Sequence, residues 1–377
     1  MLASAPAPLA VPPDLVRRQI AHVLAAWGMA RDLLETTVEA MVYADLAGID
    51  SHGLSMLMMY EQGVRAGKLD LSARPRVVRD GPATALVDAG AGLGHPAAVK
   101  AMRLAIDKAL AVGIGAVGVR NSHHFGAAGY YAALAPERGL LGLVTSTTRD
   151  VTVIPTRGAA PVLGTNPLAF AAPACGSRPF LLDMSTSTVA ANKVKVYELN
   201  GRPVPAGWVL DDRGAPVTDP ARAMDLVWRL PGGGLTPLGG TAEMSSHKGY
   251  GLGVMVQLLA GALTGASFSP VRKATRGPDA PDDIGHLLVA IDPRAFREGG
   301  GFEEDAGVVL DALHRTPPAD PALPVLVAGD PEAAARAERE QGTLSVPAAL
   351  AGLVRGICDR CGAPFVLDLP SPSRGAP

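Results

Sequence analysis

The stretch Gly48-Ile-Asp-Ser-His-Gly-Leu-Ser-Met-Leu-Met-Met-Tyr60 places a histidine between a serine and a glycine. The segments before and after this linker, about Arg31 to Leu46 and Ser55 to Ala66, both have the apolar periodicity of helices. Because imidazole titrates at about pH 6.5, His52 in such a linker can give and take a proton near neutral pH. A histidine that only caps the second helix is the alternative explanation of so short a motif.

Composition limits the classes of protein to which the chain can belong. It has 377 residues, of which 48% are hydrophobic, and a formal net charge of −2. This length allows two or more domains with a large core. The nearly neutral charge gives no electrostatic basis for binding nucleic acid or an anionic membrane. Three cysteines do not make up a disulfide framework and indicate a reducing compartment. The longest apolar run, Tyr250 to Ala266, falls short of the roughly 20 residues of a membrane-spanning helix and predicts a buried helix.

The N-terminal part of the chain is predicted to be helical after a disordered lead-in. Residues 1–13 are rich in alanine and proline and lack the positive flank and long apolar run of a signal peptide. An amphipathic helix then begins at Asp14. Near the other end, Cys358 and Cys361 form a lone C-x-x-C pair, which we interpret as incidental because a zinc ribbon needs a second pair.

A glycine-rich loop follows a short predicted strand, Thr84 to Asp88. The loop, Gly90-Ala-Gly-Leu-Gly94, leads into an amphipathic helix, so the order of elements imitates a dinucleotide-binding fingerprint. The spacing is G-x-G-x-G instead of G-x-G-x-x-G, and no acidic residue ends a second strand at the expected distance. A classical Rossmann site that uses Gly90 to Gly94 stays an alternative, and a tight turn is the simpler explanation.

A second histidine segment follows the predicted strand Ala116 to Val119. It reads Arg120-Asn-Ser-His-His-Phe-Gly126 and precedes a helix that stops near Gly139. Loops at strand ends are where α/β proteins place binding and catalytic residues. Adjacent histidines suggest a metal, but they point apart on regular structure, and no carboxylate or third histidine has ligand spacing. We expect no bound metal and predict that one of the two histidines contacts the substrate or the nicotinamide.

Two later segments can bind a phosphate group. The predicted strand Pro179 to Asp183 ends just before Met184-Ser-Thr-Ser-Thr188, which can cap a helix whose N-terminus offers unpaired N–H groups. Lys248, next to His247 at the start of the long apolar helix, can meet a phosphate or a carboxylate as a point charge. A buried hydrogen-bond acceptor at Asp183 and a solvated side chain at Lys248 are the simpler alternatives.

Turn and strand signals predict the remaining connections. Residues 231–240 are rich in glycine and are expected to form a mobile loop, and residues 270–285 are expected to form a surface loop. His286 to Ile291 and Pro324 to Ala328 are predicted strands, and a charged helix follows the second of them.

Six stretches occur in the order found in one known family. They are Ser51-His-Gly53, Asn121-Ser-His-His-Phe-Gly-Ala-Ala-Gly-Tyr130, Gly164-Thr-Asn-Pro167, Leu182-Asp-Met-Ser185, His247-Lys-Gly-Tyr-Gly-Leu252 and Gly285-His-Leu-Leu-Val-Ala-Ile-Asp292. Together they resemble the malate/L-lactate dehydrogenase family of the second type, over residues from about 15 to about 365. Relatives in that family include ureidoglycolate, sulfolactate, diketogulonate and piperideine-carboxylate oxidoreductases. Any one of these motifs is weak, but six in order make the resemblance specific.

The resemblance implies an α/β fold with two parts. The first is a three-layer NAD(P)-binding domain with a mixed sheet, not a classical Rossmann fold, over residues 76–324, with a small helical excursion near 123–140. The second is a helical domain built from residues 14–75 and 325–377, and the active site lies between the two. The resemblance further implies a cytoplasmic homodimer that acts on a small-molecule substrate with NAD or NADP. From the net charge we expect neither nucleic acid nor a membrane as a partner.

Carried over residue by residue, the resemblance implies roles for the motif residues. The family's proton donor matches His52, and its second active-site histidine matches His124. Its cofactor-contacting segments match Asp183, Met184 and Ser185, the pair His247 and Lys248, and, imperfectly, Gly329 and Asp330. We expect Asp183 to take part in catalysis as well, by holding a histidine or the cofactor, and we expect Ser51 and Tyr60 to line the substrate pocket.

One departure from the family pattern concerns the substrate. Many members carry an arginine four residues after the donor histidine, where it can bind a substrate carboxylate through two hydrogen bonds. This chain has Met56 there, which cannot pair with a carboxylate, and Arg149, placed after a strand, is the candidate replacement. The expected reaction is hydride transfer between the nicotinamide and a 2-hydroxy or 2-oxo acid, or a related carbonyl or imine. A binding or regulatory protein with the same fold and no turnover is the alternative.

Overall fold

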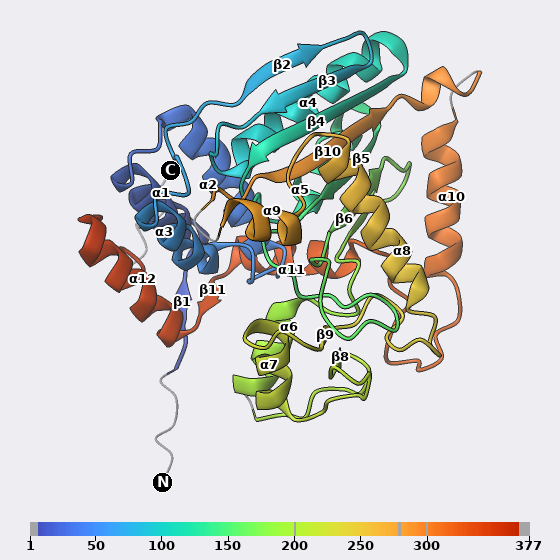
Figure 1. Ribbon diagram of the computed structural model, residues 1–377. Coiled ribbons are helices and arrows are strands. Elements are labelled where there is room, and N and C mark those ends of the chain that lie inside the picture. Colours follow the sequence, from blue (N-terminus) through green and yellow to red (C-terminus); the bar gives the residue numbers. More distant parts are fainter. Residues whose placement is uncertain (1–6, 200, 278–279, 299–300, 369–377) are drawn as a thin grey trace.

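A mixed seven-stranded sheet forms the centre of the molecule (Figure 1). The structure, a computed structural model, describes residues 7–199, 201–277, 280–298 and 301–368. The strand order is β2-β3-β4-β10-β5-β6-β7, and within this sheet only β3 and β4 are parallel neighbours. The strands are β2 (Arg76–Asp80), β3 (Thr84–Asp88), β4 (Ile114–Ser122), β5 (Leu141–Ser146), β6 (Leu168–Ala172), β7 (Phe180–Met184) and β10 (Ile284–Ile291).

This topology confirms the prediction of an α/β fold with a mixed central sheet. The alternative of a classical Rossmann dehydrogenase is wrong, because that fold needs a mostly parallel sheet with a crevice where the strand order reverses. Here β3 and β4 are the single parallel pair, and they belong to one β-α-β unit. The other neighbouring strands of this sheet are antiparallel. The glycine loop therefore imitates the fingerprint only locally.

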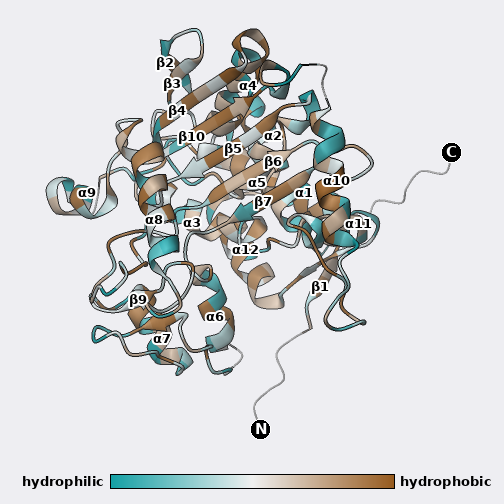
Figure 2. Cartoon of the chain, turned by 90° about the vertical axis from the view of Figure 1, so that its right-hand side faces the viewer, coloured by the Kyte–Doolittle hydropathy of each residue, from teal (hydrophilic) through white to brown (hydrophobic). Residues whose placement is uncertain are grey.

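Helices cover both faces of the sheet. Those on one face are α4 (Gly94–Val112) and α5 (Ala128–Ala132), and those on the other are α8 (His247–Val256) and its π-helical continuation η3 (Gln257–Ala262). A Cβ at Gly115 of β4 would lie 2.1 Å from the Ala105 oxygen in α4, and a Cβ at Gly118 would lie 3.0 Å from Thr264, just beyond η3. Because positions three apart point to opposite faces of a strand, the sheet is the middle of three layers, and its strands are largely hydrophobic (Figure 2).

The two ends of the chain share one apolar core, seen as neighbouring blue and red elements in Figure 1. Its elements are β1 (Leu9–Val11), α1 (Pro13–Ala26), α2 (Arg31–Leu46), α3 (Leu57–Arg65), β11 (Leu344–Val346) and α12 (Ala348–Cys361). Cys358 is buried in this core, and both it and Cys361 are free thiols. The core brings the predicted helices at the start of the chain against the last helix.

The expectation of a disordered lead-in over residues 1–13 is wrong from Leu9 onward. β1 pairs antiparallel with β11, and the Val11 side chain is fully buried in the shared core. The proline-rich composition concealed this strand, because its partner lies more than three hundred residues away. Residues 1–6 of that prediction, and residues 369–377 of the predicted helical domain, lie outside the described residues.

A third cluster of buried residues forms a small lobe at the bottom of Figure 1. Its elements are α6 (Ala191–Leu199), β8 (Val209–Leu210), α7 (Pro220–Trp228) and β9 (Gly234–Leu235). β9 corrects the expectation of a mobile loop over residues 231–240. A Cβ at Gly234 would lie 2.7 Å from the Thr152 oxygen, so this glycine allows the strand to pack closely against its neighbour.

Three further segments differ from the sequence predictions. α9 (Ser269–Arg276) occupies part of the expected surface loop, and its Arg272 is buried. Pro324 to Ala328 forms no strand and instead leads into α11 (Asp330–Gln341), with one backbone hydrogen bond from Leu181 to Ala328. The long apolar run is the α8–η3 helix, whose Leu258 is exposed, so the expectation of a buried helix holds for its sheet-facing side only.

The remaining helices are short or peripheral. They are the 3₁₀ turns η1 (Leu54–Met56), η2 (Pro136–Arg138) and η4 (Pro293–Ala295), and α10 (Phe302–His314). Of all the helices in the described part of the chain, none has the length and apolarity that crossing a membrane requires.

Candidate active site

The Ser-His-Gly turn lies between α2 and η1 and is held by a buried carboxylate. Asp45, near the end of α2, accepts a hydrogen bond from the Leu54 backbone N–H at 2.8 Å. A Cβ at Gly53 would lie 2.0 Å from a carboxylate oxygen of Asp45, so the turn requires glycine at this position. On the other side, the Ser51 hydroxyl lies 2.7 Å from Nδ1 of His52.

The structure brings the two predicted histidines together. The ring centroids of His52 and His124 are 5.5 Å apart, although His124 comes from the loop between β4 and α5. Both rings keep part of their surface exposed, whereas His95, His123 and His286 are fully buried. Within the described ranges, no group of three His, Cys, Asp or Glu side chains could hold a metal ion. Each ring of the pair therefore keeps some surface that a small molecule can reach.

Tyr60 lies behind the histidine pair. Its hydroxyl is 2.9 Å from Nδ1 of His124 and 3.5 Å from Nε2 of His95, and the side chain is fully buried. Tyr60 therefore contacts the second histidine directly, and Ser51 contacts the first.

Burial sets the charge of both histidines. It lowers the pKa of His52 to about 4, and it lowers the pKa of His124 well below the ordinary value, with smaller contributions from His52, His95, His123 and Arg149. Removing a cation from water is unfavourable, so both rings are neutral at pH 7.

Sequence reasoning missed a group of buried polar residues beneath the His124 loop. Nε2 of His123 lies 2.9 Å from one carboxylate oxygen of Asp282, and the other oxygen of this carboxylate is 3.6 Å from Arg272. Burial raises the pKa of Asp282, but the hydrogen bond from His123 and the nearby cations outweigh it, so the pKa is below the ordinary value. The carboxylate is thus ionised and holds His123, whose backbone continues directly into His124.

His286 supports the same loop from β10. Its two ring nitrogens lie 2.8 Å from the Ser146 hydroxyl and 2.9 Å from the Ser122 hydroxyl, and its ring stacks on Phe125 at 4.4 Å. A histidine at a buried position of an otherwise apolar strand was the signal in the sequence that could have pointed to this role.

The glycine loop also packs against the His124 loop. The Gly94 N–H donates to the His124 carbonyl at 3.0 Å, and a Cβ at Gly94 would lie 2.5 Å from the His123 carbonyl. The Ala91 N–H donates to the Asn121 carbonyl at 2.8 Å. These contacts explain the glycines without a cofactor, since the backbone of the loop is used to position the histidine segment.

Asp183 lies at the edge of the sheet and contacts the helix after His124. It accepts a hydrogen bond from the Gly129 N–H at 2.7 Å, and burial raises its pKa to about 6. Among the described residues no hydrogen bond joins it to His52 or His124. The segment with Gly329 and Asp330 lies beside the strand that carries Asp183, because a Cβ at Gly329 would be 3.1 Å from the carbonyl of Leu181 in that strand.

The start of α8 lies against the loop that follows β7. The Thr186 carbonyl accepts a hydrogen bond from Leu238, and the Leu238 carbonyl accepts one from Gly249. This brings the exposed side chains of His247 and Lys248 close to the loop that begins with Met184 and Ser185. Asp330 is already engaged, because its carboxylate lies 2.7 Å from His314 and accepts from the Val327 N–H at 2.8 Å.

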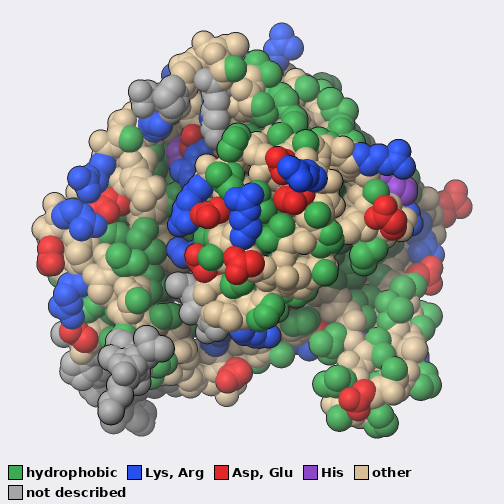
Figure 3. Space-filling view, turned by 60° about the horizontal axis from the view of Figure 1, so that its bottom comes forward, with side chains coloured by type: hydrophobic (Ala, Val, Ile, Leu, Met, Phe, Trp, Pro, Cys, Tyr) green, Lys and Arg blue, Asp and Glu red, His purple; other side chains and the backbone are tan. Residues whose placement is uncertain are grey.

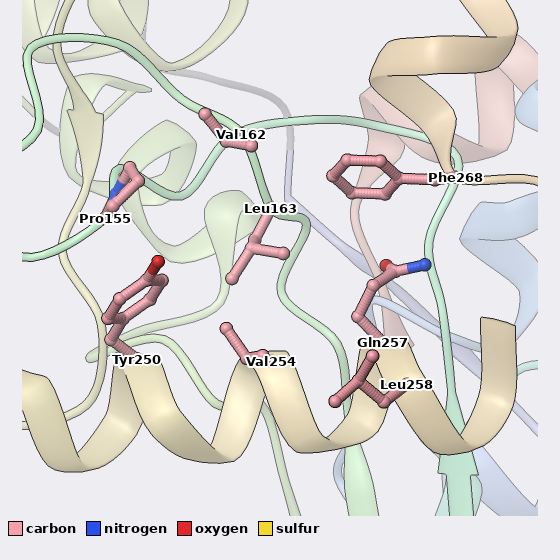
Figure 4. A pocket seen from close by; sticks show the side chains of 8 residues that line it. All are labelled: Pro155, Val162, Leu163, Tyr250, Val254, Gln257, Leu258 and Phe268. Carbon is pink, nitrogen blue, oxygen red and sulfur yellow. The ribbon is translucent and has the colours of Figure 1, made fainter. Parts of the chain in front are cut away.

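Two pockets lie near these segments, and neither is lined by His52 or His124. One, of about 200 Å³, lies between α2, β7, α10 and α11 and is lined by Gly329 and Asp330. The other, of about 190 Å³, runs along α8 and is apolar (Figure 4). Its lining residues are Pro155, Val162, Leu163, Tyr250, Val254, Gln257, Leu258 and Phe268.

Arg149 and Met56 have different environments. The Arg149 guanidinium pairs with Asp150 at 3.0 Å and lies near enough to His124 to lower the pKa of its ring. Met56 is half-buried and packs against the apolar core of the chain ends. The charge of Arg149 therefore acts on His124, although the arginine expected one turn after His52 is absent.

Comparison with known proteins first defines the class. The fold superposes on the crystal structure of malate dehydrogenase from Entamoeba histolytica with a TM-score of 0.89 and 28% sequence identity, covering 95% of this chain and 99% of that one. The protein is therefore an α/β oxidoreductase of the dehydrogenase class. The family model for malate/L-lactate dehydrogenase matches residues 11–353, and the chain belongs to this family.

Two relatives support the same placement. The chain is 40% identical over 287 residues to the malate dehydrogenase of Pyrococcus abyssi, covering 76% of each chain. It is 37% identical over 278 residues to the (2R)-3-sulfolactate dehydrogenase (NADP(+)) of Chromohalobacter salexigens, covering 73% of this chain and 79% of the relative. The resemblance seen in the six motifs is thus confirmed, and the protein is an NAD(P)-dependent oxidoreductase that acts on CH–OH groups.

Proposed function

We propose that the chain transfers a hydride between NAD(P) and a 2-hydroxy or 2-oxo acid, with His52 as the proton donor and acceptor. The observation that carries this proposal is the His52–His124 pair, two part-exposed imidazoles 5.5 Å apart on different elements. The cofactor, when bound, supplies the redox chemistry, and the protein supplies position and protons. His124 orients the substrate oxygen while His52 exchanges its proton.

The low pKa of His52 sets the conditions for this exchange. A neutral imidazole can accept the proton of a substrate hydroxyl at pH 7 as it stands. Donation in the reverse direction requires the imidazolium, which burial disfavours. An anionic substrate next to the ring favours the charged form and raises the pKa, so binding of the acid prepares His52 to act.

The residues around β7 and α8 suit a dinucleotide. Lys248 is exposed at the N-terminal end of α8, where its charge and the positive end of the helix dipole can bind a phosphate. Asp183, Met184 and Ser185 provide the adjoining edge. The pocket lined by Gly329 and Asp330 continues that edge. We assign these segments to the cofactor and the side near Arg149 to the substrate carboxylate.

The assembly also belongs to the proposal. A homodimer is supported by apolar side chains that the α8–η3 helix and its end leave exposed, including Met255, Leu258 and Leu263. The cytoplasm is supported by the free thiols of Cys175, Cys358 and Cys361. The apolar core that the two chain ends share supports a helical domain formed by both ends. This domain would close the site against the sheet. Light scattering would give twice 38.6 kDa for the dimer.

The test is a His52→Asn variant assayed with NADH and NADPH on 2-oxo acids and cyclic imines. Loss of proton transfer lowers kcat by roughly a hundred- to ten-thousandfold while cofactor binding stays intact. His22→Asn, a matched change in α1 outside the site, should keep full activity. A His52→Asn enzyme that turns over at the wild-type rate would contradict the proton-transfer role of His52. For the wild-type enzyme we expect poor turnover of malate and lactate, because Met56 stands where many relatives have an arginine that binds the substrate carboxylate.

A further inference from the structure

The hydrogen bonds of His124 determine which of its nitrogens carries the proton. The Gly126 backbone N–H approaches Nδ1 of His124 at 3.3 Å. A backbone amide can only donate, so Nδ1 must present its lone pair. Because burial keeps the ring neutral, its single proton is then on Nε2.

The Tyr60 hydroxyl approaches the same nitrogen at 2.9 Å and must therefore donate to it as well. Tyr60 is fully buried, and burial raises the pKa of its phenol, so the donor proton is retained throughout the working pH range. Of the two contacts at Nδ1, that of Tyr60 is the shorter and the stronger.

His95 completes the chain from behind. Its Nε2 lies 3.5 Å from the Tyr60 hydroxyl, whose proton already points to His124, so Nε2 of His95 can only donate. Burial lowers the pKa of His95 to about 3, so its ring is neutral, and Nδ1 is a bare lone pair. Nδ1 is also the buried atom of His95 that has no hydrogen-bond partner in the described part of the chain.

We propose that Tyr60 is a positioning residue that fixes His124 as its Nε2–H tautomer, so that this N–H is the donor that binds the substrate oxygen. The proposal rests on the proposed function and divides the roles of the histidine pair. His124 donates a hydrogen bond and cannot accept a proton at its free nitrogen, so His52 alone is the base.

The experiment is ¹⁵N NMR of histidine-labelled protein, with a His124→Gln variant to assign the signal. Wild-type His124 should show a protonated Nε2 and an unprotonated Nδ1. In Tyr60→Phe only the long contact from the Gly126 N–H, at 3.3 Å, still donates to Nδ1, which is too weak to hold one tautomer, so the signal should shift toward a mixture of both. The kcat should fall by about tenfold with little change in KM for the cofactor, because a wrongly oriented tautomer cannot assist the reaction. Tyr131→Phe is the matched control, since Tyr131 is equally buried but bonds to the Phe125 carbonyl.

A wild-type His124 protonated on Nδ1 would overturn the proposal. So would an unchanged Nε2–H signal in Tyr60→Phe, or the same mixture in Tyr131→Phe. The NMR signal is read without turnover. If the wild-type protein reduces none of the substrates tested, the proposed function fails while the spectrum still decides the tautomer.

Discussion

The two histidines of the site are held in different ways. His52 lies in a turn whose supports are close in sequence, the Ser51 hydroxyl and the Asp45 carboxylate behind Leu54. His124 lies in a loop whose supports come from distant elements, among them the Tyr60 hydroxyl of α3, 64 residues away. The first ring depends on one local turn, and the second depends on several long-range contacts at once.

This difference separates what each histidine can contribute. A ring held by one local turn can shift as substrate arrives and as its charge changes, which suits the group that exchanges a proton. A ring held on several sides keeps a constant direction, which suits a group that orients the substrate oxygen. The face of the molecule in Figure 3 is hollowed between lobes, and basic and acidic side chains are mixed across it.

The largest expected effect comes from a change that moves the His124 loop. In Gly94→Ala the new Cβ would lie 2.5 Å from the His123 carbonyl, so the loop must shift. A displacement of about 1 Å at a catalytic group lowers kcat by roughly a hundredfold. NADH titration by fluorescence should show unchanged affinity, because the glycine loop positions the histidines and does not hold the cofactor.

Gly352→Ala is the matched control for that variant. Gly352 lies in α12 with open space around its Cα, so alanine should leave kcat unchanged and raise the free energy of unfolding by about 0.5–1 kcal/mol through helix propensity. If Gly94→Ala instead abolished NADH binding and left kcat unchanged, the loop would be a cofactor site and the contrast between the two histidines would fail.

The same contrast explains what the sequence could and could not predict. The His52 motif, the bounds of β3 and the strand that carries Asp183 follow from local patterns of apolarity, turns and caps. His286 stands out in the sequence as a histidine in an apolar strand, but its partner could not be predicted, because Ser122 lies 164 residues away and only the folded sheet brings them together. β1 was missed for the same reason, since its partner strand lies near the other end of the chain.

An intermediate effect is expected from the carboxylate behind the His52 turn. Burial raises the pKa of Asp45 to about 7, so its ionised form is disfavoured in the folded protein. Wild-type stability should therefore fall as pH rises from about 4, where the unfolded carboxyl ionises, to about 7, and level off above that. Asp45→Asn keeps the acceptor for Leu54 and removes the charge.

Urea unfolding at pH 5 and pH 8 measures this difference. Between these values wild type should lose about 2 kcal/mol relative to Asp45→Asn, because the folded and unfolded pKa values differ over that window. If the free energy of unfolding changed equally in both proteins, Asp45 would already be ionised in the folded protein at pH 5, and the His52 turn would contain a negative charge. The kcat of Asp45→Asn should stay within a few-fold of wild type, since the turn keeps its hydrogen bond.

The smallest effect is expected from removing a single support of the His124 loop. Ser146→Ala deletes the hydroxyl at 2.8 Å from Nδ1 of His286 and leaves that buried nitrogen without this partner, which costs about 1–2 kcal/mol of unfolding free energy. His286 still bonds to Ser122 and stacks on Phe125, so the loop keeps its direction and kcat should change by less than about threefold. A fall in kcat as large as that of Gly94→Ala would show that the His124 loop depends on a single contact. The contrast between His124, held by several contacts, and His52, held by one turn, would then fail.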